Sequence, residues 1–248
     1  MFQEKIKASI TICIPVYNEE KYISTVIRNI RNYINSSKIS QQYIIKTLII
    51  DDGSTDNSLK EIQNCCQDLK NFKFVSKQNE GKGSAIIKSI EIADTDYILI
   101  HDSDLEYITL DIDKILEFLL TQNTKTIIFG SRYKKNNFFN SIFFNKNNNQ
   151  SFLNYYFNAI LSLIYLFKFS VKVTDSLTAF KLYPLNEISG LKFKSKKFST
   201  EHEITGFLLR KNINFFEVPI SYYPRTVEEG KKISYKDGLE ALIRVLKL

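Results

Sequence analysis

The sequence is poor in the residues that build disulfide frameworks and zinc sites, with three cysteines and two histidines among 248 residues. Cys65 and Cys66 are adjacent and cannot easily bridge each other, and Cys13 lies in an apolar run that indicates a core position. An odd number of cysteines without a regular framework indicates a reducing compartment. Two histidines are too few for a well-spaced His/Cys zinc site.

Long apolar runs are also missing. The longest, residues 155–169, is broken by Asn158, Ser162 and Lys168, and it falls short of the roughly 20 residues that span a bilayer. The apolar run near the N-terminus is too short for a signal peptide and lacks a small-residue cleavage site. We therefore expect a cytoplasmic protein that is soluble or lies peripherally on the cytoplasmic face of the membrane.

Charge and composition limit the classes of partner. The net charge of +7 favours anionic partners such as phosphates or an acidic membrane face, although a solvated Lys-rich surface gives the same value. The basic residues are spread along the chain, so no Arg/Lys stripe interleaved with aromatics predicts nucleic-acid binding. The chain is long enough to bury a core and has no internal repeat or clear linker, so we expect a single domain over residues 1–248.

Strand-like and helix-like segments alternate through the first half of the chain. Apolar, β-branched runs predict strands at residues 9–15, 43–50, 72–75, 97–100 and 126–129. Apolar residues at helical spacing predict helices at residues 21–34, 56–69, 84–93 and 110–120. This order predicts an α/β fold with a mostly parallel central sheet flanked by helices.

The pattern is looser in the second half. We predict a loop at residues 134–150, helices at 152–167 and 201–210, and a strand at 214–218. The segment 235–248 predicts a basic amphipathic helix, and its apolar face is formed by Leu239, Leu242, Ile243 and Leu246. Packing of this face on the core is the preferred interpretation, and contact with a membrane surface is the alternative.

Acidic side chains follow the predicted strand 97–100. Asp102 and Asp104 are two residues apart at the strand end, and Glu106 is two residues further on. Hard carboxylate oxygens suit Mg²⁺ or Mn²⁺, which can bridge the oxygens of a diphosphate. A surface turn capped by aspartate is the alternative, because a lone Asp-x-Asp is common.

Polar residues follow two other predicted strands and one loop. Asp52, beside Gly53, could accept hydrogen bonds from a base or ribose, and Tyr17 could stack near a base. The segment of Tyr17 also fits an ordinary helix start, and the segment of Asp52 also fits a turn that opens the next helix with Asp56 as its N-cap. The segment around Lys82 has the glycines of a phosphate-cradling loop but not the P-loop or dinucleotide spacing. Ligands of such sheets bind beyond the carboxyl ends of the strands, where these residues lie.

Together these segments resemble glycosyltransferase family two, which has the GT-A fold. The resemblance rests on four segments in order: residues 15–19, 51–56, 79–83 and 102–104. The second half resembles the dolichyl-phosphate mannose and glucose synthase branch through residues 130–132, 175–181, 224–225 and 229–234. The chain departs from that pattern at Ala179, Lys181 and Glu106, where the family usually has Gly, Arg and Gln.

The resemblance implies a Rossmann-like nucleotide-sugar-binding half at about residues 9–130 and an acceptor-side half at about 131–248. It implies a nucleotide-sugar site formed by Pro15, Tyr17, Glu19, Ile50, Asp52, Lys82, Asp102, Ser103, Arg132, Arg225 and Lys232. It implies a Mg²⁺ or Mn²⁺ site formed by Asp102, Asp104 and Glu106. The catalytic residues would be Asp104, Asp175 and Arg132.

The implied reaction is inverting transfer of a hexose from a nucleotide-diphosphate sugar such as UDP-glucose or GDP-mannose. A polyprenyl or dolichyl phosphate is the favoured acceptor, and it needs no strong base because it is already an anion. A saccharide hydroxyl in cell-surface polysaccharide synthesis is the alternative and needs a carboxylate base, from Asp175, Glu201 or Glu203. A sugar nucleotidyltransferase and a non-catalytic nucleotide-sugar-binding protein are more distant alternatives.

Overall fold

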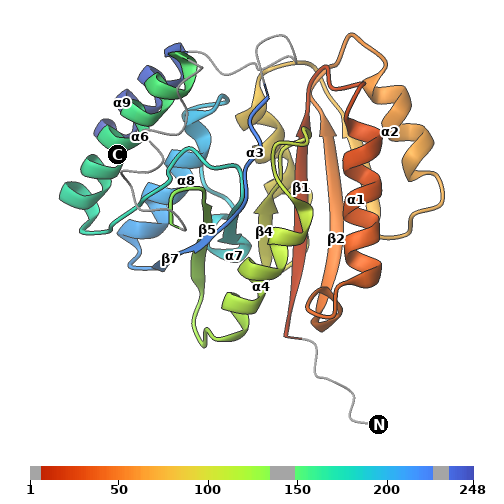
Figure 1. The fold of residues 1–248 in the computed structure, drawn as a ribbon, viewed down its shortest axis with the longest axis horizontal. Helices are drawn as coiled ribbons and strands as arrows, with labels where there is room; N and C mark the ends of the chain where they lie inside the picture. The colour runs from red at the N-terminus through yellow and green to blue at the C-terminus, as the bar shows by residue number, and fades with distance from the viewer. Residues whose placement is uncertain (1–6, 135–148, 226–234) are drawn as a thin grey trace.

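A computed structural model of the chain describes residues 7–134, 149–225 and 235–248 (Figure 1). Lys232, the other residues of 229–234 and most of the predicted loop 134–150 lie outside these ranges. The helix predicted from residue 152 begins at Asn149.

The described strands and helices follow the predicted alternation with small shifts at their ends. The strands are β1 (Ala8–Val16), β2 (Tyr43–Asp51), β3 (Phe72–Ser76), β4 (Tyr97–Ile100), β5 (Thr126–Ser131), β6 (Lys181–Pro184) and β7 (Asn214–Pro219). The α-helices are α1 (Ile23–Ser36), α2 (Ser58–Cys66), α3 (Lys82–Ile92), α4 (Ile112–Leu120), α6 (Asn149–Phe169), α7 (Leu185–Ile188), α8 (Ser199–Arg210) and α9 (Tyr235–Lys247). Short 3₁₀ helices occur at Ser40–Gln42 and Thr109–Asp111.

One sheet of seven described strands runs through the molecule in the order β3-β2-β1-β4-β6-β5-β7. All neighbouring pairs are parallel except those of β6, which is antiparallel to both β4 and β5. The predicted mostly parallel α/β fold is therefore confirmed. The sequence did not predict β6, because four residues beginning with a lysine show no recognisable strand pattern.

Helices cover both faces of the sheet, so its central strands are buried on both sides. Alternate residues of β1 from Ile10 to Val16 pack with α1, α2 and α4. Cys13, which points to the opposite face, packs with α3, α6, α8 and α9. Figure 1 shows α1 and α4 in front of the sheet and α6 beside α9 at its left end.

The apolar side chains of the last helix are divided between core and solvent. Ala241 and Val245 are buried against the core. Leu239, Ile243 and Leu246 are 51%, 45% and 61% exposed. The preferred interpretation, in which the predicted apolar face packs on the core, is therefore wrong for these three residues. Neighbouring α6, rather than α9, buries the larger side chains of this layer, Leu161 and Tyr165.

The carboxyl ends of β1, β2, β4 and β5 lie at one edge of the sheet, because these strands are parallel. The antiparallel β6 presents its first residue, Lys181, at the same edge. Helix α3 begins there too, and Gly83 in its first turn lies directly against the segment Lys196–Lys197. A Cβ at this position would collide with the Thr200 hydroxyl and the Lys197 carbonyl oxygen.

We predict that Gly83→Ala destabilises the protein by about 1–3 kcal/mol through this collision. Helix propensity alone gives the opposite sign, because alanine is about 1 kcal/mol better than glycine inside a helix. Urea unfolding of the native and variant proteins measures the difference. A variant as stable as the native protein, or more stable, would contradict the close approach.

Candidate active site

A cavity of about 280 Å³ opens at the edge where the parallel strands end. It brings together most of the predicted site residues: Pro15, Tyr17, Glu19, Asp52, Lys82, Asp102, Ser103, Asp104, Glu106, Arg132 and Arg225. Ile50 is fully buried beside Leu48 and Ala85 and does not line the cavity. Asp175 is buried behind Arg132, and Lys232 lies outside the described residues.

The nucleoside-side residues are placed by the turns that follow β1 and β2. The Asp52 N–H donates to the Val16 carbonyl oxygen at 2.8 Å, which ties the two strand ends together. The Asp52 carboxylate accepts the Gly81 N–H at 2.7 Å and contacts Lys77 Nζ at 2.7 Å. Asp52 therefore holds the glycine-containing loop in front of α3.

Each aspartate of the Asp102-Ser103-Asp104 segment contacts a cationic side chain of the protein. Asp102 Oδ1 lies 2.7 Å from Lys82 Nζ, and Asp104 Oδ2 lies 2.9 Å from Arg225 Nη2. Burial raises the pKa of Asp104 to about 7, together with the neighbouring carboxylates of Asp102 and Glu106 and against the effect of Arg225. The two aspartates therefore face different cations instead of facing each other.

Glu106, the third predicted metal ligand, is held by the segment that follows β7. The Tyr222 hydroxyl donates to Glu106 Oε2 at 2.7 Å, and the Arg225 N–H donates to Oε1 at 2.9 Å. No group of three or more acidic, histidine or cysteine side chains converges on one point within the described residues. The oxygen donors suit a hard cation, but they must exchange their present partners to share one.

Alternating charges continue from Asp102 and Lys82 to Glu201 and Lys181, which also line the cavity. Glu201 of α8 lies 3.1 Å from Lys82 and also pairs with Lys181 at the start of β6. Burial alone would raise the pKa of Glu201, but Lys181 and Lys82 lower it to about 2. Glu201 is therefore an ionised structural partner of two lysines.

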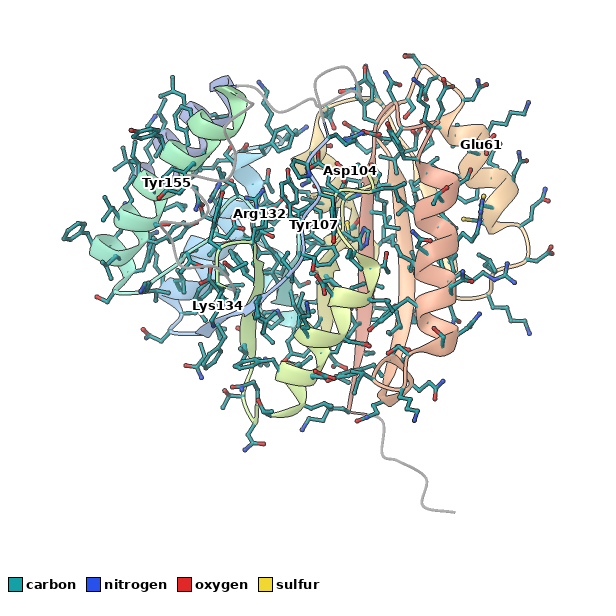
Figure 2. The ribbon with its side chains drawn as sticks, viewed as in Figure 1. Glu61, Asp104, Tyr107, Arg132, Lys134 and Tyr155 are labelled. Carbon is teal, nitrogen blue, oxygen red and sulfur yellow. The ribbon has the colours of Figure 1, made fainter. Side chains whose placement is uncertain are left out.

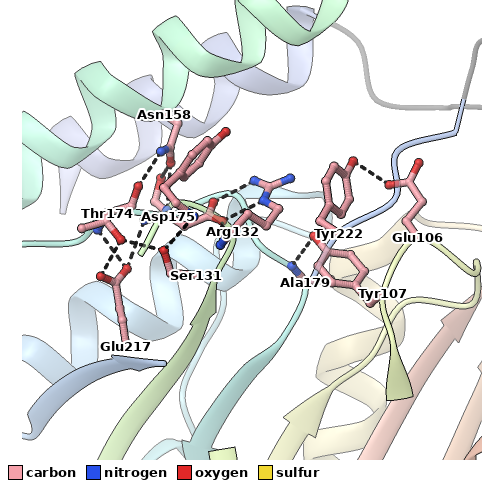
Figure 3. Close-up of polar contacts among 12 residues, drawn as sticks. Glu106, Tyr107, Ser131, Arg132, Asn158, Thr174, Asp175, Ala179, Glu217 and Tyr222 are labelled. Carbon is pink, nitrogen blue, oxygen red and sulfur yellow. Dashed lines mark hydrogen bonds and ion pairs between the residues drawn. The ribbon is translucent and has the colours of Figure 1, made fainter. Parts of the chain in front are cut away.

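Arg132, which follows β5, is fixed by a two-point contact with Asp175 (Figure 3). Arg132 Nε and Nη2 each lie 2.7 Å from a different oxygen of the Asp175 carboxylate. Among the described residues, this contact uses two of the five N–H donors of the guanidinium. Burial opposes the charged form of Arg132, but Asp175 raises its pKa well above the usual value.

Two further residues hold the loop that carries Asp175. Glu217 Oε1 accepts the N–H groups of Thr174 and Asp175 at 2.9 and 3.0 Å. Asn158 of α6 donates to the Thr174 carbonyl oxygen at 2.7 Å and accepts the Ser176 N–H at 2.8 Å. Figure 3 shows these contacts on the side of Asp175 away from Arg132, so they support Arg132 indirectly.

Arg132 lies between the acidic residues and helix α6. Its guanidinium is 4.8 Å from the ring centre of Tyr222, which binds Glu106. The adjacent Tyr133 contacts Tyr155 of α6, with ring centres 6.1 Å apart. Figure 2 shows Arg132 between Asp104 and Tyr155.

The three carboxylates considered as general bases all have structural partners. Asp175 binds Arg132, and Glu201 binds two lysines. Glu203 accepts the N–H groups of Lys194 and Ser195 and does not line the cavity. None of these three offers a free carboxylate to the cavity.

Sequence reasoning missed several residues that shape the site. The cavity is also lined by Tyr107, Lys181, Phe198, His202 and Tyr222. Asn158 and Glu217 each interrupt an apolar run, which is a signal that could have found them. The aromatic residues carry no such signal, because they resemble core positions in the sequence.

Residues 11–183 match the family described as Glycosyl transferase family 2. The chain belongs to this family. The predicted family is therefore confirmed, and the match covers the cavity segments from β1 to β6.

Individual family relatives cover the chain to different extents. The UDP-N-acetylglucosamine–dolichyl-phosphate N-acetylglucosaminyltransferase of Methanococcus voltae is 26% identical over 96% of this chain and 95% of its own length. The dolichyl-phosphate beta-glucosyltransferase of Dictyostelium discoideum is 27% identical over 50% of this chain and 39% of its own.

Solved structures agree with the GT-A fold of this family member. Glucosyl-3-phosphoglycerate synthase from Mycobacterium tuberculosis, in complex with Mn²⁺, UDP and glucosyl-3-phosphoglycerate, superimposes with a TM-score of 0.69. The superposition covers 98% of this chain and 81% of the other at 16% identity, so it establishes the fold alone. The predicted GT-A architecture is confirmed.

The buried His202 predicts that the folded protein loses stability at acid pH. Burial, with help from Lys181, lowers the pKa of His202 to about 3, and its Nδ1 lies 3.0 Å from the Tyr165 hydroxyl. The unfolded chain binds this proton near pH 6.5, so stability is lost as the pH falls from about 6.5 towards 3.

The loss should approach 1.4 kcal/mol per pH unit well below pH 6.5, beyond the contributions of other groups. His202→Asn cannot titrate but can still bind Tyr165, so its stability should fall less steeply with acid. Urea midpoints at pH 7, 6 and 5 for both proteins test this. Identical slopes would show that His202 is not kept neutral by the fold.

Proposed function

We propose that this glycosyltransferase is a metal-dependent, inverting enzyme that transfers a sugar from a nucleotide-diphosphate sugar to a polyprenyl phosphate. The sugar class includes N-acetylglucosamine as well as glucose and mannose, because the relative from Methanococcus voltae is named for an N-acetylglucosaminyl transfer. That relative and the one from Dictyostelium discoideum are both named as dolichyl-phosphate enzymes, which supports a lipid phosphate as the acceptor.

On the donor side, the cavity residues fit a nucleotide diphosphate with a divalent cation. Asp102, Asp104 and Glu106 would hold the cation through hard oxygen ligands. A bound cation would stabilise the negative charge that develops on the departing nucleotide diphosphate. The Mn²⁺ and UDP bound to the Mycobacterium tuberculosis enzyme support this assignment.

Residues on either side of the cation site have separate proposed roles. We assign Pro15, Tyr17, Glu19 and Asp52 to the nucleoside, because they line the cavity at the ends of β1 and β2. Asp175 is a positioning residue in this proposal, since it is buried behind Arg132 and lines no part of the cavity.

One observation supports the anionic acceptor most directly. The three carboxylates considered as bases are bound to cations or backbone N–H groups, whereas Arg132 lines the cavity and its contact with Asp175 uses two of its five N–H donors within the described residues. A hydroxyl acceptor requires a base to remove its proton, but a phosphate acceptor does not. Arg132 would bind the acceptor phosphate and orient its attacking oxygen.

The surface next to Arg132 suits the lipid part of such an acceptor. Helices α6 and α9 pack side by side, and each exposes one stripe of large apolar side chains. These side chains are Tyr156, Ile160, Leu163, Leu166 and Phe167 on α6, and Leu239, Ile243 and Leu246 on α9. None of the helices in the described part of the chain is long and apolar enough to cross a bilayer. We propose that this α6–α9 face contacts the membrane peripherally.

A transfer assay tests the proposal. The native protein with Mn²⁺ should transfer sugar from UDP-glucose, UDP-N-acetylglucosamine or GDP-mannose to undecaprenyl or dolichyl phosphate. Asp104→Asn should lower the rate about 100-fold or more, since it removes charge from the cation site. Chelation of the metal should abolish transfer. Transfer to saccharides and not to any polyprenyl phosphate would overturn the acceptor assignment.

Vesicle sedimentation tests the α6–α9 face. Leu163→Glu together with Leu246→Glu should weaken binding to anionic vesicles at least 10-fold, because each leucine contributes about 1.5–3 kcal/mol when buried. Leu110→Glu is the control for an exposed leucine away from this face, since Leu110 is 60% exposed, comparable to Leu246 at 61%, but lies in the 3₁₀ helix Thr109–Asp111 before α4. Equal vesicle binding by native protein and double variant would contradict the membrane contact.

A further inference from the structure

The guanidinium of Arg225 is surrounded by three carboxylates. Nη1 lies 3.1 Å from Glu19 Oε2, Nη2 lies 2.9 Å from Asp104 Oδ2, and Nε lies 3.6 Å from Glu106 Oε1. These side chains are almost buried, with 7%, 12% and 8% of the carboxylate side chains and 12% of the arginine exposed. Arg225 therefore neutralises much of the negative charge at the end of β4 and in the turn after β1.

Two of these carboxylates, Asp104 and Glu106, belong to the proposed cation site. A guanidinium and a divalent cation cannot both lie against the same oxygens, because like charges repel at such distances. We propose that Arg225 occupies the cation site when no donor is bound, an inference that rests on the proposed function. Arg225 competes with the divalent cation and moves to the diphosphate when the donor binds.

The attachment of Arg225 suits this exchange. Its backbone N–H is held by Glu106, and the preceding Tyr222 forms an isolated antiparallel bridge with Tyr107. The guanidinium is at the end of a flexible side chain and is 5.1 Å from the ring centre of Tyr22. Its Nε–H is buried and has no hydrogen-bond acceptor among the described residues. The backbone of Arg225 is thus held in place, while its guanidinium does not use all of its hydrogen-bond donors among the described residues.

Lys82, the other cation at this site, differs in one respect. It contacts Glu201 at 3.1 Å as well as Asp102 at 2.7 Å, so it would lose one of its two carboxylate partners to a cation. Among the described residues, Arg225 would lose two of its three carboxylate partners, Asp104 and Glu106, and would keep Glu19. A diphosphate supplies the lost partner, because arginine binds phosphate oxygens through two parallel N–H groups. Arg225 thereby makes cation binding depend on the nucleotide diphosphate.

Mn²⁺ binding measured by electron paramagnetic resonance, with and without UDP, tests this role without relying on turnover. Native protein should bind Mn²⁺ weakly alone and more tightly with UDP, after subtraction of a protein-free blank. Arg225→Gln should bind Mn²⁺ alone about 10-fold more tightly, which corresponds to about 1.4 kcal/mol, and should gain less from UDP. Arg225→Lys, which keeps the charge but loses the fork, should show a smaller increase.

Lys46→Gln is the control for net charge, because Lys46 pairs with Asp94 in an exposed ion pair and does not line the cavity. The competition is contradicted if Arg225→Gln binds Mn²⁺ no more tightly than Lys46→Gln and Arg225→Lys binds it like the native protein. That result would leave the proposed cation site itself in place. If no protein binds Mn²⁺ even with UDP, the cation site of the proposed function is wrong and the competition falls with it. If Arg225→Gln does not fold, the Arg225→Lys comparison decides.

Discussion

The cavity depends on one constraint: each carboxylate collected at the carboxyl edge of the sheet must be compensated by a nearby cation. Parallel strands end at the same edge, so Glu19, Asp52 and Asp102, which follow β1, β2 and β4, are brought together by the topology. Unpaired charges in so buried a place would be strongly destabilising. Lys82 and Arg225 provide the compensation for Asp102 and Glu19. The ion pairs thus allow the fold to keep several carboxylates close together in a nearly buried place.

The antiparallel β6 and the loop before it join this charged site to the second half of the chain. Lys181 enters the edge only because β6 runs against its neighbours, and it continues the row of charges through Glu201. The preceding loop carries Asp175, which fixes Arg132 beside α6. The distance from the proposed donor site to the proposed acceptor site is therefore set by the sheet and by buried contacts, not by exposed loops.

The sequence predicted those parts of the site that depend on local patterns. Asp52, Asp102 and Asp104 were found because polar residues after apolar runs mark strand ends, and parallel ends share an edge. The strand β6 could not be found, since it is stabilised by β4 and β5, which lie far away in the sequence. The contact of Arg225 with Asp104 spans 121 positions, and no local pattern encodes such a pairing. The exposure of Leu246 was equally invisible, because an amphipathic pattern does not tell which partner covers it.

Ligand binding at such a site is an exchange of partners. In the proposed exchange, a cation that arrives alone would displace Arg225 from Asp104 and leave it with Glu19, and an anion that arrives alone would separate Arg225 from Asp104. Either event exposes one member of a nearly buried pair, which costs several kcal/mol when nothing replaces the lost partner. A cation and a diphosphate that arrive together satisfy both members at once. In the proposed exchange, the internal ion pair would therefore discriminate against free metal ions and against isolated anions, and the same charges that stabilise the fold would favour the complete metal–nucleotide ligand.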